Sequence, residues 1–588
     1  MNVIGIHDGH NASVALFRDG KIVYALSEER ILRQKNAGGI PVHALNRLLK
    51  DMQLAPGDVE CIALSGKVAP RPAWYDRGLI LKRYEEQCSP HIWRQGEPPK
   101  VVKENGYYQT ARKLLRKVRN KPPLDEFAEK RKKEIELLGF REEQIGYLDH
   151  HACHAAAAYY GHGDFGGEIL CLTNDGGGDG LCATVSVGRE GLIERVAQTE
   201  QKHSFASLYA RATFLMGMMP LEHEYKLMGL APYADAERAE AIKEKLLDCF
   251  VWDEATPLTW EKREDMPPTR LWGGLLRQHF DLKRFDVIAA AMQLLIEEMA
   301  IRWVRSCIRQ TGIRSLALSG GLFMNVKLNK RILELPEVNS LFVMPSCSDE
   351  SNCIGAAYLG AVVRGYNGCA IKPLKDLYLG AIYSDKQIEQ AVQSCAGAGG
   401  VTVSRPDNMA ETAAEFLAAG EIVARYAGRE EFGARALGNR SILADPSRQN
   451  NIIKINKMIK KRDFWMPFAG SMTTDQARTN LNIGKQHFAP YMIMAFDPKQ
   501  NRDDFIAATH PYDETMRPQM LDEEWNPQYY RIIARFAEIS GKKGGVLNTS
   551  FNLHGYPIVS SPEDAIEVFT KSGLNIMAIG SYLLVKKS

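Results

Sequence analysis

The chain has 588 residues, of which 45% are hydrophobic and 25% are charged, and its formal net charge is +3. This composition is typical of a soluble globular enzyme, the length predicts two or three domains, and so small a net charge excludes a strong general attraction to nucleic acid or anionic membranes. The 11 cysteines are scattered and include no Cys-x-x-Cys pair. This favours a reduced, cytoplasmic compartment over a disulfide framework.

The first 30 residues predict strands and a ligand-facing loop. An apolar, β-rich start is followed by a hairpin at residues 12–26, which turns at Asp19-Gly20. The polar loop at residues 7–11 precedes this hairpin and is able to face a ligand. Its His10 is a candidate general base for a hydroxyl group, although an ordinary loop histidine fits equally well. A secretory signal is not expected, because the start lacks basic residues and a clean apolar run.

Residues 70–141 differ from the rest of the chain and predict a mostly helical insertion on the surface. Basic side chains cluster there, with aromatic ones interspersed. They are Lys113, Arg116, Lys117, Arg119, Lys121, Lys130, Arg131, Lys132 and Lys133, with Trp74, Trp93, Tyr107 and Tyr108. A solvated helical face is one interpretation, and a lid or docking surface for an anionic acceptor is the other. The sequence leaves both open.

From about residue 146 to residue 366 the pattern alternates between strands and helices. Apolar runs at residues 168–173, 315–318 and 340–344 each end in a polar or glycine-rich loop. In open α/β sheets, ligands bind beyond the carboxyl ends of the strands. The apolar helix near residues 285–308 contains charged side chains, so we expect a buried or amphipathic helix and not a membrane span.

Two histidines and two aspartates form a candidate metal site. Asp149 can cap a helix on which His150 and His154 lie one turn apart on the same face. Neutral imidazoles at that spacing can bind one metal ion, although a pair of satisfied histidines is the alternative. Asp175, before a glycine loop, and Asp349 each follow a strand-like run, where a turn or cap is the alternative. Together the four side chains suit Fe(II), Mn or Zn better than Mg or Ca.

Two glycine-containing segments are candidates for nucleotide binding. Gly320 and Gly321 join a strand to a helix that starts near Asn325. Glycines let the backbone approach a nucleotide, and a helix N-terminus favours anions. Lys226 lies beside a second glycine turn at Gly229. An ordinary strand-to-helix turn and a surface helix end are the alternatives for these two segments.

The glycine-rich stretch near residues 370–400 marks a domain boundary, and residues 401–588 form a second α/β unit without tandem repeats. Its segment 428–441 contains arginines between glycines. Arginine forks bind phosphate bidentately, and no P-loop motif is present in the chain. A solvated charged surface is the alternative, which the interleaved apolar residues weaken. The candidate phosphate-binding residues are Arg435, Arg440, Lys460, Arg517, Asn548 and Ser550.

Taken in order, seven segments resemble the motifs of the O-carbamoyltransferase family, which includes the nodulation U protein and the cephem and tobramycin carbamoyltransferases. The resemblance covers nearly the full length, apart from residues 70–141. The segments are His10-Asn-Ala-Ser13, Ser27-Glu28-Glu29-Arg30, His150-His-x-x-His154, Lys226-Leu-Met-Gly-Leu-Ala231, Ser319-Gly-Gly-x-x-x-Asn325, Gly433-x-Arg-Ala-Leu-Gly-x-Arg-Ser441 and Leu547-Asn-Thr-Ser-Phe-Asn552.

The resemblance implies two α/β domains and a two-stage reaction. Residues 1–395 would form a domain of the actin-like ATPase and sugar-kinase superfamily, similar to the tRNA threonylcarbamoyl-transfer protein. Residues 396–588 would form a YrdC-like domain that makes carbamoyl-adenylate from carbamoyl phosphate and ATP. The first domain would then transfer the carbamoyl group to an acceptor hydroxyl of a sugar, glycan or natural product.

The resemblance also implies residue roles and partners. His10 would be the base, and the metal, with Fe(II) preferred over Mn or Zn, would be held by His150, His154, Asp175 and Asp349. The adenylate would be held by Lys226, Gly229, Gly320, Gly321 and Asn325. Carbamoyl phosphate or ATP would be held by Arg435, Arg440, Lys460, Arg517, Asn548 and Ser550. ATP would carry Mg, no nucleic-acid partner is expected, and a homodimer and the identity of the acceptor stay open.

The chain departs from the family pattern beside one of these motifs. Some members have arginine where this chain has Met466, and proline where it has Gly470. Lys461 or Arg462 would then supply the missing phosphate contact. A threonylcarbamoyl-type transferase acting on tRNA and a non-catalytic nucleotide-binding regulatory protein are the alternative functions.

Overall fold

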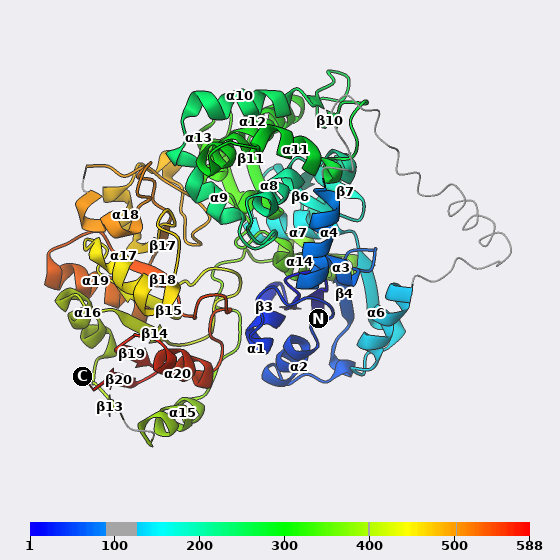
Figure 1. The fold of residues 1–588 in the computed structure, drawn as a ribbon. Coiled ribbons are helices and arrows are strands. Elements are labelled where there is room, and N and C mark those ends of the chain that lie inside the picture. Colours follow the sequence, from blue (N-terminus) through cyan, green and yellow to red (C-terminus); the bar gives the residue numbers. More distant parts are fainter. Residues whose placement is uncertain (90–125, 398–399, 501, 588) are drawn as a thin grey trace.

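The computed structural model describes residues 1–89, 126–397, 400–500 and 502–587 (Figure 1). The fold is α/β with mixed sheets, as the sequence predicts. The first sheet has the strand order β3-β2-β1-β4-β5. Its strands are β1 (Asn2–His7), β2 (Ser13–Arg18), β3 (Lys21–Ser27), β4 (Cys61–Ser65) and β5 (Ile145–Leu148). The predicted hairpin is confirmed, because β2 and β3 pair antiparallel around Asp19-Gly20.

A second sheet repeats the topology of the first. Its order is β12-β11-β6-β7-β8, with strands β6 (Ile169–Gly178), β7 (Leu181–Arg189), β8 (Leu192–Glu200), β11 (Ser315–Ser319) and β12 (Ser340–Val343). In each sheet the first three strands pair antiparallel and the last two run parallel to the first. The duplication therefore lies in topology, since the sequence shows no tandem repeat.

Two helices, α7 (His150–His162) and α14 (Asn352–Val363), pack against each other between these sheets. Helix α14 contacts β1, β2 and β4, and α7 contacts β6 and β11. The close approach requires a glycine at Gly355, because a Cβ there would collide with the carbonyl oxygen of Cys153 on α7. This packing fixes the first turn of α7 beside the first turn of α14.

The helices that follow β8 and precede β12 gather beside the second sheet, at the top of Figure 1. Helix α12 (Phe285–Thr311) is mostly buried, as predicted, and contacts α8 (Ala206–Leu215), α9 (Glu224–Leu230), α10 (Ala236–Leu247) and α13 (Val326–Glu334). Within the described ranges, no helix has the length and apolar character needed to span a membrane.

The C-terminal part, yellow to red in Figure 1, is built on an eight-stranded sheet of order β13-β20-β19-β14-β15-β18-β16-β17. Its strands are β13 (Val401–Ser404), β14 (Val423–Tyr426), β15 (Arg440–Ala444), β16 (Ala469–Thr473), β17 (Pro518–Leu521), β18 (Val546–Ser550), β19 (Ile576–Ile579) and β20 (Tyr582–Lys586). Successive residues of β14 and β15 enter different apolar clusters. Helices α16 (Met409–Ala419) and α19 (Pro527–Ser540) cover one face, and α15 (Asp385–Gly397), α17 (Asn450–Ile455) and α20 (Pro562–Lys571) cover the other.

Helix α15 lies across the predicted domain boundary. The sequence places this boundary between residues 395 and 396, within the last turn of the helix. In the structure, Ile388, Val392 and Cys395 of α15 belong to the apolar cluster of the eight-stranded sheet, and the helix contacts α20. The apolar face of α15 is therefore buried with the C-terminal part of the chain.

The insertion at residues 70–141 is partly described. It contains α3 (Pro72–Tyr75), α4 (Arg77–Gln87) and α6 (Glu126–Glu136). Lys130, Lys132 and Lys133 form surface ion pairs with glutamates, in agreement with a solvated helical face, but Arg131 is buried. Trp93, Tyr107, Tyr108, Lys113, Arg116, Lys117, Arg119 and Lys121 lie outside the described residues.

Candidate functional site

A cavity of about 1000 Å³ is lined by residues of both domains. The N-terminal domain contributes the loop after β1, the turn between β6 and β7, and the segment that leads into α14. The C-terminal domain contributes the loops that surround β15, β17 and β18. These wall segments include residues 7–11, 175–180, 348–350, 433–435, 466–468 and 554–558.

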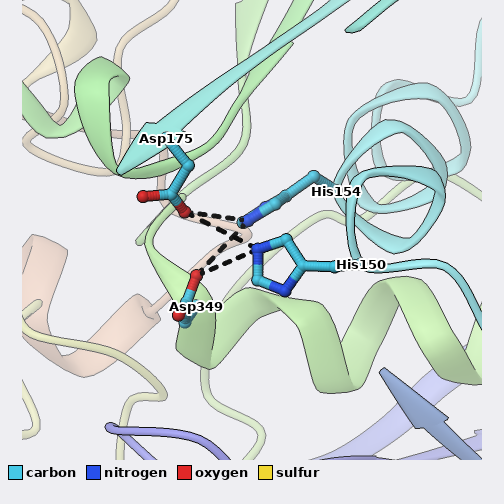
Figure 2. A group of neighbouring side chains, drawn as sticks. All are labelled: His150, His154, Asp175 and Asp349. Atoms are coloured by element: carbon cyan, nitrogen blue, oxygen red, sulfur yellow. Dashed lines mark ion pairs between the residues drawn. The ribbon is translucent and has the colours of Figure 1, made fainter. Parts of the chain in front are cut away.

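Three residues of the cavity wall, His150, Asp175 and Asp349, form the His/Asp cluster together with the fully buried His154 (Figure 2). One ligand atom from each residue lies within 4.8 Å of all the others. His154 Nε2 is 3.3 Å from Asp175 Oδ2 and 3.4 Å from Asp349 Oδ1. His150 Nε2 is 3.8 Å and 3.5 Å from the same two oxygens. The structure thus brings together all four side chains that the sequence proposes as metal ligands.

Local structure explains this convergence. Asp149 caps α7 by accepting a hydrogen bond from the Ala152 amide at 2.8 Å, which places His150 and His154 on one face of the first turns. Asp175 lies near the end of β6, and Asp349 follows β12 in the same sheet. Because β6 and β12 run parallel on either side of β11, their carboxyl ends reach the same edge of the sheet.

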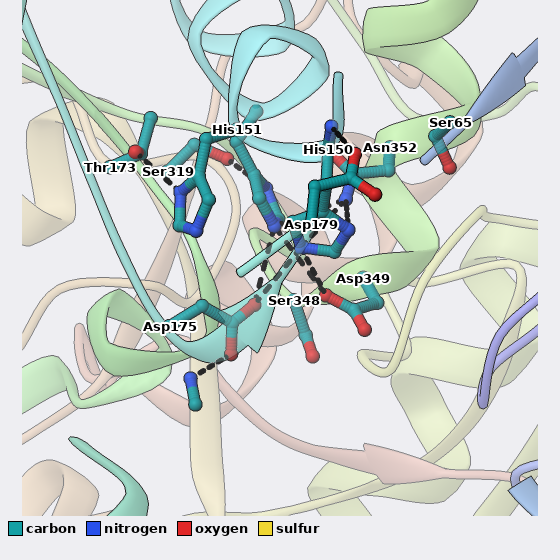
Figure 3. A network of polar contacts seen from close by, with 12 residues as sticks. Ser65, His150, His151, Thr173, Asp175, Asp179, Ser319, Ser348, Asp349 and Asn352 are labelled. Carbon is teal, nitrogen blue, oxygen red and sulfur yellow. Dashed lines mark hydrogen bonds and ion pairs between the residues drawn. The ribbon is translucent and has the colours of Figure 1, made fainter. Parts of the chain in front are cut away.

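Surrounding polar groups orient the imidazoles (Figure 3). His154 Nδ1 lies 3.0 Å from Ser319 Oγ, so its Nε2 is left to face the carboxylates. Asp179 accepts a hydrogen bond from the His150 amide at 2.8 Å and so holds the start of α7. Asn352, at the start of α14, lies 3.1 Å from His154 Nε2. Such outer contacts fix the tautomer and direction of metal-binding histidines.

The electrostatics of the cluster favour a bound cation. Burial opposes the charge of Asp175, but the neighbouring His150 and His154 outweigh burial and hold its pKa well below the ordinary value. Burial lowers the pKa of His150, yet Asp349 and Asp175 outweigh it and raise that pKa to about 9. Asp175 Oδ2 and Asp349 Oδ1 are buried and accept no hydrogen bond from the described residues. Two imidazoles and two such carboxylates fit a divalent transition metal.

His10 lies next to this cluster and lines the cavity. Its Nδ1 is 3.3 Å from Asp349 Oδ2. His7 supports the same loop, because His7 Nδ1 lies 2.8 Å from Ser65 Oγ and His7 Nε2 lies 3.1 Å from the His10 carbonyl oxygen. Burial lowers the pKa of His7 to about 3, so this imidazole is neutral at physiological pH. His10 is thus held in a fixed loop with its ring on the cavity wall.

The other domain contributes the cationic cluster, which comprises Arg435, Lys460, Arg462 and Arg517, all lining the cavity. None of them forms an ion pair with a described acidic residue. Lys460 Nζ donates to Ser550 Oγ at 3.0 Å, and Arg462 donates to Thr549 Oγ1 at 3.1 Å. The Nε atoms of Arg435 and Arg517 are buried without a described hydrogen-bond partner.

The cations repel one another. Burial, followed by Arg435 and Arg462, lowers the pKa of Arg517 well below its ordinary value. Burial, with Arg435 adding to it, lowers the pKa of Arg462 to about 10. Burial and Arg462 likewise lower the pKa of Lys460. Guanidinium groups gathered without carboxylates are a favourable site for phosphate oxygens.

Three of the predicted nucleotide- and phosphate-binding residues do not line the cavity: Gly320, Arg440 and Asn548. Arg440 points into the core, where it donates to the carbonyl oxygens of Ala427 at 2.7 Å and Gly428 at 3.2 Å and stacks on a tyrosine ring. Asn548 is buried and donates to other protein groups. Gly320 has φ +107° and packs on the backbone of residue 174, which explains its glycine without a nucleotide. These contacts give each of the three residues a structural role, and their binding roles stay predictions.

The other predicted nucleotide residues do reach the cavity wall: Lys226, Gly229, Gly321 and Asn325. Lys226 pairs with Asp463 of the second domain at 3.1 Å, and Asn325 caps α13 by accepting from the Leu328 amide at 3.0 Å. At the departure from the family pattern, Met466 and Arg462 line the cavity and Lys461 does not. Of the two candidate cations, only Arg462 therefore lies on the described cavity wall.

Fold and site together define an α/β protein with an imidazole–carboxylate cluster and a cationic cluster around one cavity. The family model for the carbamoyltransferase N-terminus matches residues 2–358, and that for the carbamoyltransferase C-terminus matches residues 414–586. The chain therefore belongs to the carbamoyltransferase family and is a transferase, which confirms the resemblance drawn from its motifs.

Relatives extend over most of the chain. Nodulation protein NolNO of Sinorhizobium fredii is 29% identical over 593 residues, covering 98% of this chain and 79% of that protein. An uncharacterized protein of Methanocaldococcus jannaschii is 31% identical over 78% of this chain and 76% of its own length. The 3'-hydroxymethylcephem-O-carbamoyltransferase of Amycolatopsis lactamdurans is 28% identical over 45% of this chain and 48% of that enzyme. Among solved structures, nucleotide-bound HypF superposes with a TM-score of 0.35 at 13% identity over 62% of this chain and 47% of that one, too distant a likeness to inform function.

Proposed function

We propose that the chain is an ATP-dependent O-carbamoyltransferase that makes carbamoyl-adenylate at the cationic cluster and transfers its carbamoyl group to an acceptor hydroxyl beside the His/Asp cluster. The observation that carries this proposal is the shared cavity of about 1000 Å³, whose wall contains the cationic cluster and three of the four residues of the His/Asp cluster. A reactive acyl intermediate made at one cluster could then reach the other within the same cavity, which would limit its hydrolysis.

The reaction balances in three steps. Water cleaves carbamoyl phosphate to carbamate and phosphate. The carbamate oxygen attacks the α-phosphorus of ATP, and pyrophosphate leaves with the electron pair of the broken P–O bond. The acceptor hydroxyl then attacks the carbamoyl carbon, AMP leaves, and the hydroxyl proton passes to a base. Phosphate charge has to be neutralised in the first two steps, which suits Arg435, Arg462 and Arg517.

His10 is the proposed base for the third step. It lines the cavity, and its Nδ1 faces Asp349 Oδ2 at 3.3 Å, an orientation that leaves Nε2 for the acceptor proton. The His/Asp cluster would hold a divalent metal, with Fe(II) favoured and Mn or Zn as alternatives, and a metal there would polarise a carbonyl or phosphoryl oxygen. Lys226, Gly229, Gly321 and Asn325 are the proposed contacts of the adenylate, and Lys460 and Ser550 would assist with phosphate.

The duplicated sheets support an actin-like ATPase-superfamily assignment for the N-terminal domain. A YrdC-like assignment for the C-terminal domain stays a prediction. The named O-carbamoyltransferase among the relatives supports a hydroxylated small molecule or glycan as acceptor. Transfer to tRNA is the second candidate, and only the basic insertion favours it.

The test is exchange of labelled pyrophosphate into ATP. We expect exchange that requires carbamoyl phosphate, and carbamate adducts detected by mass spectrometry when hydroxylated acceptors are added. The variant His10→Asn should keep the exchange and lose the transfer, whereas Arg517→Ala should lose the exchange. Release of ADP in place of pyrophosphate and AMP would contradict the proposal.

A further inference from the structure

A buried arginine links the insertion to the loop that carries His10. Arg131 lies on α6 and is 3% exposed, and its partner Asp8 is 2% exposed. Arg131 Nε is 2.6 Å from Asp8 Oδ2, and Arg131 Nη2 donates to Asp8 Oδ1 at 2.7 Å. The guanidinium thus faces both oxygens of one carboxylate, in a bidentate geometry that lysine cannot reproduce.

The same guanidinium also holds the end of the neighbouring strand β4. Arg131 Nη1 donates to the Gly66 carbonyl oxygen at 2.7 Å, and Nη2 lies 3.3 Å from that of Ser65. Its charge also lies 5.1 Å from the centre of the Tyr147 ring. Strands β1 and β4 pair in parallel, so Arg131 joins their carboxyl ends from outside the sheet.

These contacts surround the loop at residues 7–11. Asp8 stands between His7 and the turn that leads to His10, and His7 holds the His10 carbonyl and Ser65. Asp8, Gly66 and His10 all line the cavity, whereas Arg131 does not. Arg131 therefore contacts two residues of the cavity wall, Asp8 and Gly66, without lining the cavity itself.

Neighbouring cations on α6 differ from Arg131. The side chain of Lys130 is 63% exposed and that of Lys133 is 71% exposed, and both pair with glutamates one turn away on the same helix. Pairs of this kind contribute little to stability. A buried bidentate pair with a residue 123 positions away in sequence cannot be explained as a solvated helical face.

We propose that Arg131 is a positioning residue, which fixes the loop at residues 7–11 so that His10 stays beside Asp349 and directed at the acceptor hydroxyl. The insertion thereby contributes to the transfer step and not to adenylate formation. The assignment of His10 as base rests on the proposed function, but its restraint by Arg131 does not.

The first test reports His10 directly and needs no acceptor. Diethyl pyrocarbonate labels accessible imidazoles, and mass spectrometry reads the rate at each histidine. We expect Arg131→Lys and Arg131→Ala to raise the labelling rate of His10 several-fold, with buried His203 still protected and Lys133→Ala matching the wild type. An unchanged rate at His10, or a parallel rise at His203, would overturn the proposal.

The second test separates the two half-reactions, with glycerol as a hydroxyl probe. In Arg131→Lys, the kcat for AMP release, with water or glycerol as the acceptor of the carbamoyl group, should fall about 10–100-fold. Pyrophosphate exchange that depends on carbamoyl phosphate, and the KM for ATP, should stay unchanged. Equal losses of exchange and AMP release would overturn the positioning role. Lack of exchange in the wild-type protein would instead contradict the proposed function, and the labelling result would still decide the role of Arg131.

Discussion

The His/Asp cluster and the cationic cluster, which share one cavity, have opposite charge balances. The His/Asp cluster has two carboxylates that lower the free energy of a positive charge, and His150 responds with a pKa raised to about 9. The cationic cluster has four positive groups without acidic partners among the described residues, and burial and mutual repulsion lower the pKa of Arg517 and Lys460. The first cluster is therefore short of a cation and the second is short of anions. This difference is the reason for proposing the metal at the first cluster and the phosphates at the second.

The largest effect should come from removing a metal ligand. His154→Ala should abolish binding of a transition metal and lower carbamoyl transfer at least about 1000-fold, because the polarising charge is lost, while pyrophosphate exchange persists with Mg. Metal analysis and the two half-reaction assays measure this. His162 lies on the same helix but does not line the cavity. The variant His162→Gln is therefore the matched control and should still bind metal at the His/Asp cluster. Loss of pyrophosphate exchange in His154→Ala would mean that the two clusters act as one site, which would contradict the proposed separation.

In the cationic cluster, a substitution should lower adenylate formation and at the same time raise the stability of the fold. Arg517→Met should lower adenylate formation roughly 100-fold, because phosphate charge is no longer neutralised. It should also raise the free energy of unfolding by about 1 kcal/mol, because repulsion from Arg435 and Arg462 is relieved. Inorganic phosphate should then raise the melting temperature of the wild-type protein more than that of the variant. A destabilised variant would mean that Arg517 is held by the protein itself.

Arg435 and Arg440 sharpen the comparison, because they stand in one motif but have different surroundings. Arg440→Met should lower the free energy of unfolding by roughly 3 kcal/mol, because backbone carbonyls lose their donor inside the core. Arg435→Met should instead raise it by up to about 1 kcal/mol, because the same repulsion between Arg435 and Arg517 is relieved, and should raise the KM for carbamoyl phosphate. Urea titrations and steady-state kinetics measure the pair, and a reversed order of stability would contradict these placements.

The smallest effect is proton release on metal binding. Burial lowers the pKa of His150, but Asp349 and Asp175 raise it to about 9, so a proton occupies the metal-free cluster at pH 7.5. Binding of Mn(II) should release about one proton, measurable by calorimetry in buffers of different ionisation enthalpy. In metal-free protein this raised pKa contributes stability that is complete below pH 6.5 and lost as the pH rises through about 9. A proton count near zero would contradict the charge assigned to His150.

The sequence predicts the His/Asp cluster well because its geometry follows from local rules. Helical spacing aligns His150 with His154, and the carboxyl ends of parallel strands bring Asp175 and Asp349 to one edge. Strand limits, the α/β class and the hairpin follow from the same periodicities. The repeated sheet topology cannot be recognised in the sequence, because the two sheets have the same strand order and connections but different amino acids.

The cationic cluster is harder to predict from the sequence. Arg435 lies in a loop and Arg440 begins β15, so two arginines five positions apart point to the cavity and to the core. Residue type predicts a phosphate site, but it does not give the direction of each side chain. Asp8 and Arg131 are missed for another reason, since a contact across 123 residues leaves no local pattern.

Anomalous diffraction from crystals soaked with Mn(II) and inorganic phosphate tests the central claim most directly. The account predicts a manganese peak between His150, His154, Asp175 and Asp349, and phosphate density against Arg435, Arg462 and Arg517 in the same cavity. Phosphate bound at the His/Asp cluster, or manganese absent from it, would contradict the proposal that this cluster binds the metal and the cationic cluster binds phosphate.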